Sequence, residues 1–475
     1  MALVITNNIS ALNAQHNLAR TTEALNKSLE RLSTGLRINR GADGPANLVI
    51  SEQQRAQIVG LEQALENTDK AIAMIQTAEG ALNEINRLLL KIRELALDSA
   101  NSAVNDADAL AANQAEVKNA LDTIKRIAET TQFGTKKLLD GSAGMTGIAS
   151  DPDVTVLRVT DKATEGTYAV NITTAAERAW VEAGTAQTGT LASDEHLTIN
   201  GVTIALSAGM TQTQVIDEIN KYTAQTGVIA DNGGTGGATR LYTQQFGSDA
   251  SVTVVSDTND TGLGNTTGFG TTQLSDTGVD IAGTIGGGAA TGKGRVLTGD
   301  TGEAGQGIAL EIGIDAANII QTVSGAQGTV QVLDKSLVFQ IGPNANQTVK
   351  FAIDKASPDA LAIGLAGNLF AKLADIDVQS AQGAQDAIAM VDQAIDEIST
   401  LRGDLGAFQT NTLESTRNNL RTTLENLRAA ESVIRDTDFA AEIARFTSQQ
   451  VLLQAGASVL SAANQVPQIV LALLQ

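Results

Sequence analysis

The stretch GGAATGK, Gly287–Lys293, is the part of this sequence that most resembles a phosphate-binding site. Its glycines and its lysine match the first seven positions of a P-loop, in which backbone amides cradle phosphate. The next residue is Gly294 rather than serine or threonine, so the hydroxyl that would hold magnesium is missing. No strand-and-helix frame surrounds the stretch. We therefore interpret it as a flexible glycine loop and expect no nucleotide site.

Two further features could indicate metal chemistry. The stretch DTNDTG, Asp257–Gly262, resembles the start of an EF-hand loop, but Gly268 stands where that loop needs a glutamate. We expect a solvated loop there. The two histidines are His16 and His196, and no HExxH spacing surrounds His196. We predict His196 on a surface loop and His16 on a helix, with no ligand role for either.

The composition argues against several other classes of function. Cysteine is absent, so disulfides, thiolate metal sites and cysteine nucleophiles are excluded. The formal net charge of −21 argues against a nucleic-acid partner, because phosphates attract clustered lysine and arginine. No apolar run reaches the roughly 20 residues of a membrane-spanning helix. We predict no catalytic, metal-binding or cofactor-binding residues, no enzyme activity and no membrane partner.

Both ends of the chain have the apolar spacing of long helices. Gly41 and Gly44 interrupt the first stripe, and Pro45 can take the first position of the next helix. Comparable stripes continue to Ala128 and resume over residues 388–434. In the first stripe, leucines recur in steps of three and four, which places them on one helix face as in a coiled coil: Leu25, Leu29, Leu32 and Leu36.

The middle of the chain has a different composition. Most of the 45 glycines, every tyrosine and the single tryptophan lie within Gly141–Phe370. Threonine, valine and isoleucine alternate with polar residues there, which is typical of short strands joined by turns. We therefore predict an α+β fold, with a long antiparallel α-helical coiled-coil bundle formed by both termini and a β-rich inserted central domain.

Both termini are apolar and uncharged although the chain is acidic. No Lys, Arg, Asp or Glu precedes Arg20, and none follows Arg445. The first residues lack the basic start of a secretory signal, so we expect no cleaved signal peptide. Each large aliphatic side chain contributes about 1.5–3 kcal/mol when fully buried, yet two paired helices cannot cover all sides of their stripes. We expect both termini to be disordered in the monomer and to fold on assembly with copies of the same chain.

The motifs at both ends resemble those of bacterial flagellins. The resemblance covers roughly residues 1–175, including ERLSTGLRIN, KIRELALDSAN and TQFGTKKLLDG, and it resumes from about Ala384 with LRGDLGAFQ and ESVIRDTDFA. It implies three structural layers. Residues 1–44 and 436–475 would be terminal helices of the filament inner core, 45–178 and 376–435 a helical coiled-coil domain with a short β-hairpin, and 179–375 a variable outer domain.

The resemblance also implies a function and a set of partners. Copies of the chain would polymerise into the extracellular flagellar filament for swimming, after export through the flagellar type III apparatus. An export chaperone, the cap protein and hook-junction proteins would be further partners. The expected assembly core consists of apolar residues of the two terminal helices: Ile5, Ile9, Leu12, Leu18, Val451, Leu452, Val459, Leu460, Val466, Ile469, Val470 and Leu473.

One more site follows from the resemblance alone. Flagellins that stimulate a host Toll-like flagellin receptor carry a motif similar to LLKIRELA here, which supplies Lys91, Arg93, Glu94 and Leu95, and a glutamate that matches Glu116. Lys91 stands where the stimulating motif has arginine. Lysine cannot form the planar paired hydrogen bonds of arginine, so we expect weakened recognition.

Two other interpretations stay open at this stage. A hook–filament junction protein shares both helical arms with flagellin. A secreted coiled-coil adhesin or effector would need no apolar element at either terminus, so it would keep its binding activity without them.

Overall fold

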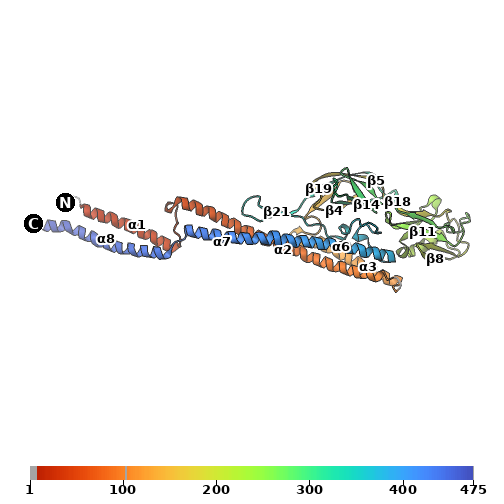
Figure 1. Cartoon of the computed structure of the whole chain (residues 1–475), viewed down its shortest axis with the longest axis horizontal. Helices are drawn as coiled ribbons and strands as arrows, with labels where there is room; N and C mark the ends of the chain where they lie inside the picture. Colours follow the sequence, from red (N-terminus) through yellow and green to blue (C-terminus); the bar gives the residue numbers. More distant parts are fainter. Residues whose placement is uncertain (1–7, 102–103, 474–475) are drawn as a thin grey trace. The chain divides into compact units, whose positions relative to one another are not determined.

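The computed structural model describes residues 8–101 and 104–473, with side chains described as far as residue 465 (Figure 1). Its contacts divide the chain into two compact units. The first contains Met1–Asp69, Gln340–Thr348 and Glu414–Gln475, and the second contains Lys70–Phe339 and Val349–Leu413. These boundaries differ from the three predicted ranges, and the division into three layers stays a prediction. The predicted α+β class is confirmed, because long helices from both ends flank a β-rich centre.

The first unit is built from long helices. Its elements are α1 (Ile9–Thr34), the 3₁₀ turn η1 (Gly41–Asp43), the start of α2 (Pro45–Ser99), α7 (Ser415–Arg435) and α8 (Phe439–Leu473). Pro45 opens α2, as expected from its missing N–H. Between α2 and α7, the expected leucine and isoleucine stripes form one buried cluster: Ile58, Leu61, Ala64, Leu420 and Leu424, with Leu65 and Leu427 packed beside them.

The helical part of the second unit comprises the rest of α2, α3 (Ala107–Thr130), α6 (Ala381–Ala407) and the π-helix η5 (Phe408–Glu414). The stripe residues Ile85, Leu89 and Ile92 of α2 are fully buried. An ion pair joins α2 to α6, with Arg93 Nε 2.6 Å from Asp392 Oδ1. The short strands β1 (Gln132–Phe133) and β2 (Lys136–Lys137) form the hairpin expected in TQFGTKKLLDG.

An eight-stranded antiparallel sheet dominates the β-rich part of the second unit, in the order β3-β19-β5-β13-β14-β15-β16-β4. Three of its strands lie between Gly141 and residue 179, where the composition predicts short strands and the resemblance implies a helical domain with one hairpin. Their alternating apolar residues belong to the sheet core together with Leu297, Leu310 and Val330. The bounds are β3 Met145–Ala149, β4 Val154–Val159, β5 Gly166–Thr174, β13 Ala282–Ile285, β14 Gly288–Lys293, β15 Val296–Gly299, β16 Ile308–Ile312 and β19 Gly325–Asp334.

Two smaller sheets have a separate hydrophobic core, which includes Leu197, Val215 and Leu241. Their strand orders are β6-β10-β9 and β12-β11-β7-β8. The bounds are β6 Arg178–Glu182, β7 Glu195–Ile199, β8 Val202–Leu206, α4 Gln212–Lys221, α5 Thr223–Thr226, β9 Val228–Asp231, β10 Arg240–Phe246, β11 Ser251–Ser256 and β12 Leu274–Thr277. Minor elements are η2 Thr235–Gly237, β17 Ile314–Asp315, β18 Asn318–Thr322, β20 Leu337–Gln340, β21 Thr348–Phe351, η3 Pro358–Ala360 and η4 Leu373–Asp375.

The structure corrects two local predictions. The P-loop-like stretch is not a flexible loop, because Gly288–Lys293 is strand β14, paired with β13 and β15. A methyl group at Gly292 would overlap the carbonyl oxygen of Ile281, so this glycine permits close packing of the backbone. His196 lies in strand β7 rather than in a loop, with Nδ1 2.8 Å from Asp257 Oδ2. Asp257–Gly262 is a loop, and His16 is exposed on α1, as predicted.

Replacing Gly292 with alanine tests the packing of β14. We expect Gly292→Ala to lower the free energy of unfolding by about 3 kcal/mol, because the added methyl overlaps backbone atoms that cannot rotate away. The control is Gly80→Ala on α2, where nothing lies within 4 Å. There the better helix propensity of alanine should raise stability by roughly 0.5–1 kcal/mol. The stabilities of both variants are measured by urea unfolding, monitored by circular dichroism and by Trp180 fluorescence. Equal free energies of unfolding for the two variants would contradict the packing argument.

Candidate functional site

The two terminal helices, α1 and α8, lie side by side in the first unit, although they come from opposite ends of the chain (Figure 1). Asn8 connects them near their free ends. Its Oδ1 accepts a hydrogen bond from the amide of Ala11 at 3.1 Å and caps α1, while its Nδ2 donates to the carbonyl of Ala463 at 2.9 Å. A methyl group at Gly456 would lie 3.1 Å from Leu18 Cδ1, so this glycine lets the helices approach closely.

At the other end of the pair, the backbones of the two chain segments are hydrogen-bonded directly. Gly35 ends α1 with φ 74°, the left-handed conformation that glycine adopts at a helix C-terminus. Its carbonyl accepts from the amide of Thr437 at 2.9 Å, and the amide of Arg37 donates to the carbonyl of Arg435 at 2.7 Å. Asp438 then caps α8 as predicted, since its Oδ1 accepts from the amides of Ala440 and Ala441. The entry into α8 is therefore held against the end of α1.

One buried carboxylate sets the register between the helices. Glu442, on α8, is 4% exposed, and its Oε1 accepts a hydrogen bond from the buried Ser28 hydroxyl of α1 at 2.6 Å. Its Oε2 lies 3.7 Å from Arg31 Nη1 and 3.6 Å from Arg445 Nη1. A buried charge is tolerated only where such partners are in place, so sliding one helix along the other would separate Glu442 from Ser28 and Arg31 and leave it only Arg445 of its own helix.

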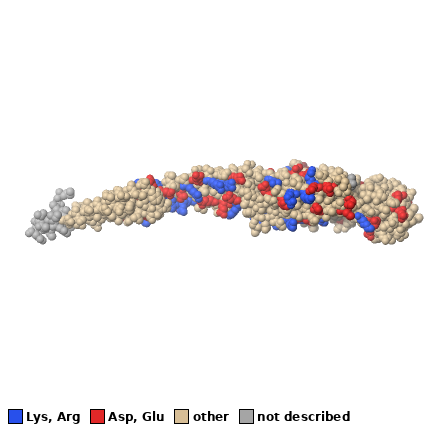
Figure 2. Space-filling model, turned by 90° about the horizontal axis from the view of Figure 1, so that it is seen from below, with Lys and Arg blue, Asp and Glu red and all other residues tan. Residues whose placement is uncertain are grey.

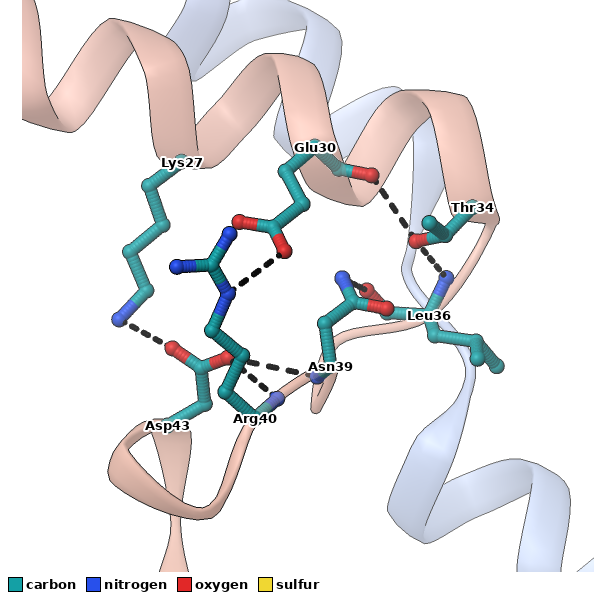
Figure 3. Close-up of polar contacts among 7 residues, drawn as sticks. All are labelled: Lys27, Glu30, Thr34, Leu36, Asn39, Arg40 and Asp43. Carbon is teal, nitrogen blue, oxygen red and sulfur yellow. Dashed lines mark hydrogen bonds and ion pairs between the residues drawn. The ribbon is translucent and has the colours of Figure 1, made fainter.

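The loop after α1 is held by a separate set of polar contacts (Figure 3). Lys27 Nζ lies 2.6 Å from Asp43 Oδ1, and Asp43 Oδ2 accepts from the amides of Asn39 and Arg40. The hydrogen bond from Lys27 is the main reason that the pKa of Asp43 lies below its usual value. Arg40 Nε also pairs with Glu30 Oε1 at 3.1 Å. The loop thus folds its charged side chains back onto α1.

Beyond this charged loop, the helix pair exposes apolar side chains to solvent. Figure 2 shows that the terminal part of the molecule lacks the Lys, Arg, Asp and Glu side chains that cover the rest of this face. Five residues of the expected assembly core are between 56% and 65% exposed: Ile9, Leu12, Val451, Leu452 and Val459. Leu18 and Leu460 are half-buried. Ile5 lies outside the described residues, and so do the side chains of Val466, Ile469, Val470 and Leu473.

Two residues of this surface were missed in the sequence. Phe439 and Ile443 are 52% and 53% exposed, and they lie on the first turns of α8. Their spacing of four residues places them on one face, and this signal was available in the sequence. The apolar spacing is easily overlooked, because the charged residues Glu442 and Arg445 in the first turns of α8 are typical of an ordinary solvent-exposed helix start.

The residues expected at a receptor site are spread over α2 and α3. Lys91, Arg93 and Glu94 lie on α2; Lys91 pairs with Glu94 at 3.2 Å, and Arg93 pairs with Asp392 of α6. Leu95 is 7% exposed, so its side chain packs in the core instead of facing solvent. Glu116 is exposed on α3. A partner approaching this surface would therefore meet polar side chains that are mostly engaged in ion pairs.

Within the described residues, no group of three or more His, Cys, Asp or Glu side chains is arranged to hold a metal ion. Among those same residues, no helix combines the length and the hydrophobicity that crossing a membrane requires. The feature of the described structure that most needs explanation is therefore the exposed apolar surface of α1 and α8.

Removing the Glu442 carboxylate tests its role in the helix pair. We expect Glu442→Ala to destabilise the pairing of α1 with α8 by roughly 1–3 kcal/mol, because Ser28 and Arg31 lose their buried acceptor. The control is Glu23→Ala, an exposed glutamate on α1. Hydrogen exchange of the α1 amides should accelerate only in the Glu442 variant. Equal exchange in the two variants would show that Glu442 does not hold the register.

Comparison with known proteins identifies the family. The model of the bacterial flagellin N-terminal helical region matches residues 5–144, and that of the C-terminal helical region matches residues 388–474. The B-type flagellin of Pseudomonas aeruginosa is 36% identical over 516 aligned residues, covering all of both chains. A flagellin of Salmonella typhimurium is 31% identical over 504 aligned residues, again covering all of both chains.

Solved structures are more distant. FliC from Burkholderia pseudomallei is 17% identical with a TM-score of 0.24, covering 71% of this chain and 98% of that one. The D2-D3 domains of the flagellar cap protein FliD from Escherichia coli reach 20% identity and a TM-score of 0.27, covering 40% of this chain and 99% of that one. These TM-scores are below the level at which structural similarity is informative. The full-length sequence relatives establish the family: the chain belongs to the bacterial flagellins and is a subunit of the extracellular flagellar filament.

Proposed function

We propose that α1 and α8 together form the surface through which copies of this chain assemble, with Ile9, Leu12, Val451, Leu452 and Val459 in the contact. The observation that carries this proposal is their exposure on the parts of α1 and α8 that carry no charge, before Arg20 and after Arg445. Monomeric soluble proteins rarely expose contiguous apolar surface of this kind, and such surfaces mark interaction sites. Leu18 and Leu460, which are half-buried, would complete the contact, together with Ile5, Val466, Ile469, Val470 and Leu473 from the ends of the chain.

The energetics favour many neighbours over one. Each exposed aliphatic side chain contributes roughly 1–2 kcal/mol when a partner covers its open half. The absence of charge after Arg445 means that copies can pack there without burying an unpaired ion. A helical array of the same chain supplies identical surfaces on several sides of each pair. In dilute monomer, we expect both termini to be disordered and to fold on assembly.

The remaining partners follow from membership of the family. We expect export through the flagellar type III apparatus with the help of a chaperone, contact with the hook-junction proteins at the base, and addition of subunits beneath the cap. A host Toll-like flagellin receptor would meet Lys91, Arg93, Glu94 and Glu116, with Leu95 as internal support. The polar face of α2 and α3 supports this last proposal, because Lys91, Glu94 and Glu116 are exposed.

Charges placed on the apolar surface test the assembly proposal. We expect Leu12→Glu and Val451→Glu each to abolish elongation from short filament seeds, because the new carboxylate would be buried among neighbours. The free energy of monomer unfolding should change by less than about 0.5 kcal/mol, since both positions are already exposed. Sedimentation and electron microscopy measure elongation. A chain ending at Arg445 should also fail to elongate.

The matched control for these variants is Leu263→Glu, at a residue 74% exposed in a loop of the β-rich part. It introduces the same charge at an exposed leucine and should elongate normally. Normal elongation of the Val451 variant, or of the chain ending at Arg445, would show that α8 is not the assembly surface.

Lys91→Arg tests the receptor site. We expect a severalfold gain of potency in a receptor reporter assay, because arginine can form paired planar hydrogen bonds that lysine cannot. The control is Lys118→Arg, an exposed lysine on α3 outside the motif, which should leave potency unchanged. Equal potency of the unaltered chain, the Lys91→Arg variant and the Lys118→Arg variant would show that Lys91 does not belong to the receptor site.

A further inference from the structure

The β-rich part of the chain contains two Asn-Gly pairs, Asn200–Gly201 and Asn232–Gly233. Asparagine followed by glycine is the dipeptide most prone to spontaneous deamidation, because glycine offers no side chain to hinder attack by its own backbone nitrogen. We propose that Asn232 is a site of spontaneous deamidation in the folded subunit, whereas Asn200 is protected by its hydrogen bonds. The proposal concerns a covalent modification and does not depend on the assembly surface.

The chemistry needs only water. The backbone nitrogen of Gly233 loses its proton and bonds to Cγ of Asn232, the Cγ–Nδ2 bond breaks, and ammonia leaves with that proton. Water then opens the resulting five-membered imide at either carbonyl, which yields aspartate or isoaspartate. No atom is oxidised or reduced, and the net change is the conversion of an amide and water into a carboxylate and ammonium.

Asn200 cannot reach this geometry without breaking several contacts. Asn200 and Gly201 form the two-residue turn between β7 and β8, with φ values of 47° and 83°. The Asn200 Nδ2 donates to the carbonyls of Thr226 at 2.8 Å and Ser251 at 3.2 Å. Its Oδ1 accepts from the amide of Thr253 at 2.8 Å. Both ends of the side-chain amide are therefore held away from the Gly201 nitrogen.

Asn232 is in the opposite situation. It is exposed in the loop that follows β9, and within the part of the chain that the structure describes its side chain makes no hydrogen bond. The loop continues through Gly233 and Gly234, which allow wide backbone rotation. The amide of Gly233, which must become the nucleophile, donates to Asp231 Oδ1 at 2.9 Å. One hydrogen bond therefore has to open before this nitrogen can attack, whereas several hold the side chain of Asn200.

The product would change a site that is already rich in carboxylates. Asp231 pairs with Arg240, at 2.6 Å between Oδ2 and Nη2, and Glu182 accepts hydrogen bonds from Thr235 in the same loop. A new carboxylate at position 232 would compete for Arg240. Isoaspartate would in addition place one extra methylene in the backbone next to the β9–β10 pairing. Deamidation would therefore make this corner of the subunit more acidic and loosen it locally.

Peptide mass spectrometry of the full-length chain tests the proposal. Folded protein is aged at mildly alkaline pH, and conversion at residues 200 and 232 is followed separately. We expect Asn232 to convert at least about tenfold faster than Asn200, because the Asn200 turn must first open. A parallel sample in denaturant is the internal control. There both pairs should convert at similar rates, since the fold no longer holds either side chain.

Two variants test whether Asn232 is the residue that deamidates. Asn232→Ser should remove the acidic species that builds up during ageing of the folded chain, and Asn200→Ser should leave it unchanged. Equal rates for residues 200 and 232 in the folded chain would overturn the proposal. An Asn232 that stays intact when folded but converts in denaturant would overturn it equally, because the loop would then protect its asparagine.

Discussion

One buried carboxylate, that of Glu442, joins the two chain ends through the side chains of Ser28 and Arg31. Apolar contacts between α1 and α8 are non-directional and would tolerate several registers. Glu442 removes this freedom, because Ser28 and Arg31 stand at one place on α1. Together with the backbone hydrogen bonds of Gly35 and Arg37 to the opposite segment, it fixes which apolar side chains of the pair face solvent. The set of apolar side chains that the pair exposes is therefore determined by polar contacts.

This arrangement separates two kinds of stability within the first unit. The α2–α7 contact buries its own leucines within the chain, as Leu61 and Leu424 show. The α1–α8 pair leaves Leu12 and Val451 exposed, and in the proposed assembly other copies of the chain would cover them. A subunit built in this way can be soluble as a monomer and still gain substantially from polymerisation.

Much of the helical architecture could be predicted from the sequence, because side-chain burial there follows a simple period. Ile85 and Leu89 are buried where the stripe placed them, and Asp438 caps α8. The β-rich part was harder. The stretch containing Gly292 has the composition of a loop. It becomes strand β14 because it pairs with its sequence neighbours β13 and β15, and β13 in turn pairs with β5, more than 100 residues earlier in the chain. The π-helix of Phe408–Glu414 likewise follows from tertiary packing, in which Phe408 stacks on Phe351 with ring centroids 4.4 Å apart. Ile9, Leu12 and Val451 of the expected assembly core are exposed, and their role in assembly stays a prediction. Phe439 and Ile443 were not predicted, because charged residues lie between and beside them.

The contact between Asn8 and Ala463 joins residues 455 positions apart. A chain that lacks its last segment therefore has no α8 against which α1 can pack, so the helix pair can form only in a molecule that carries both ends. The pair thus reports on the integrity of the chain: under the proposed assembly, a truncated product of synthesis or proteolysis would present an incomplete surface.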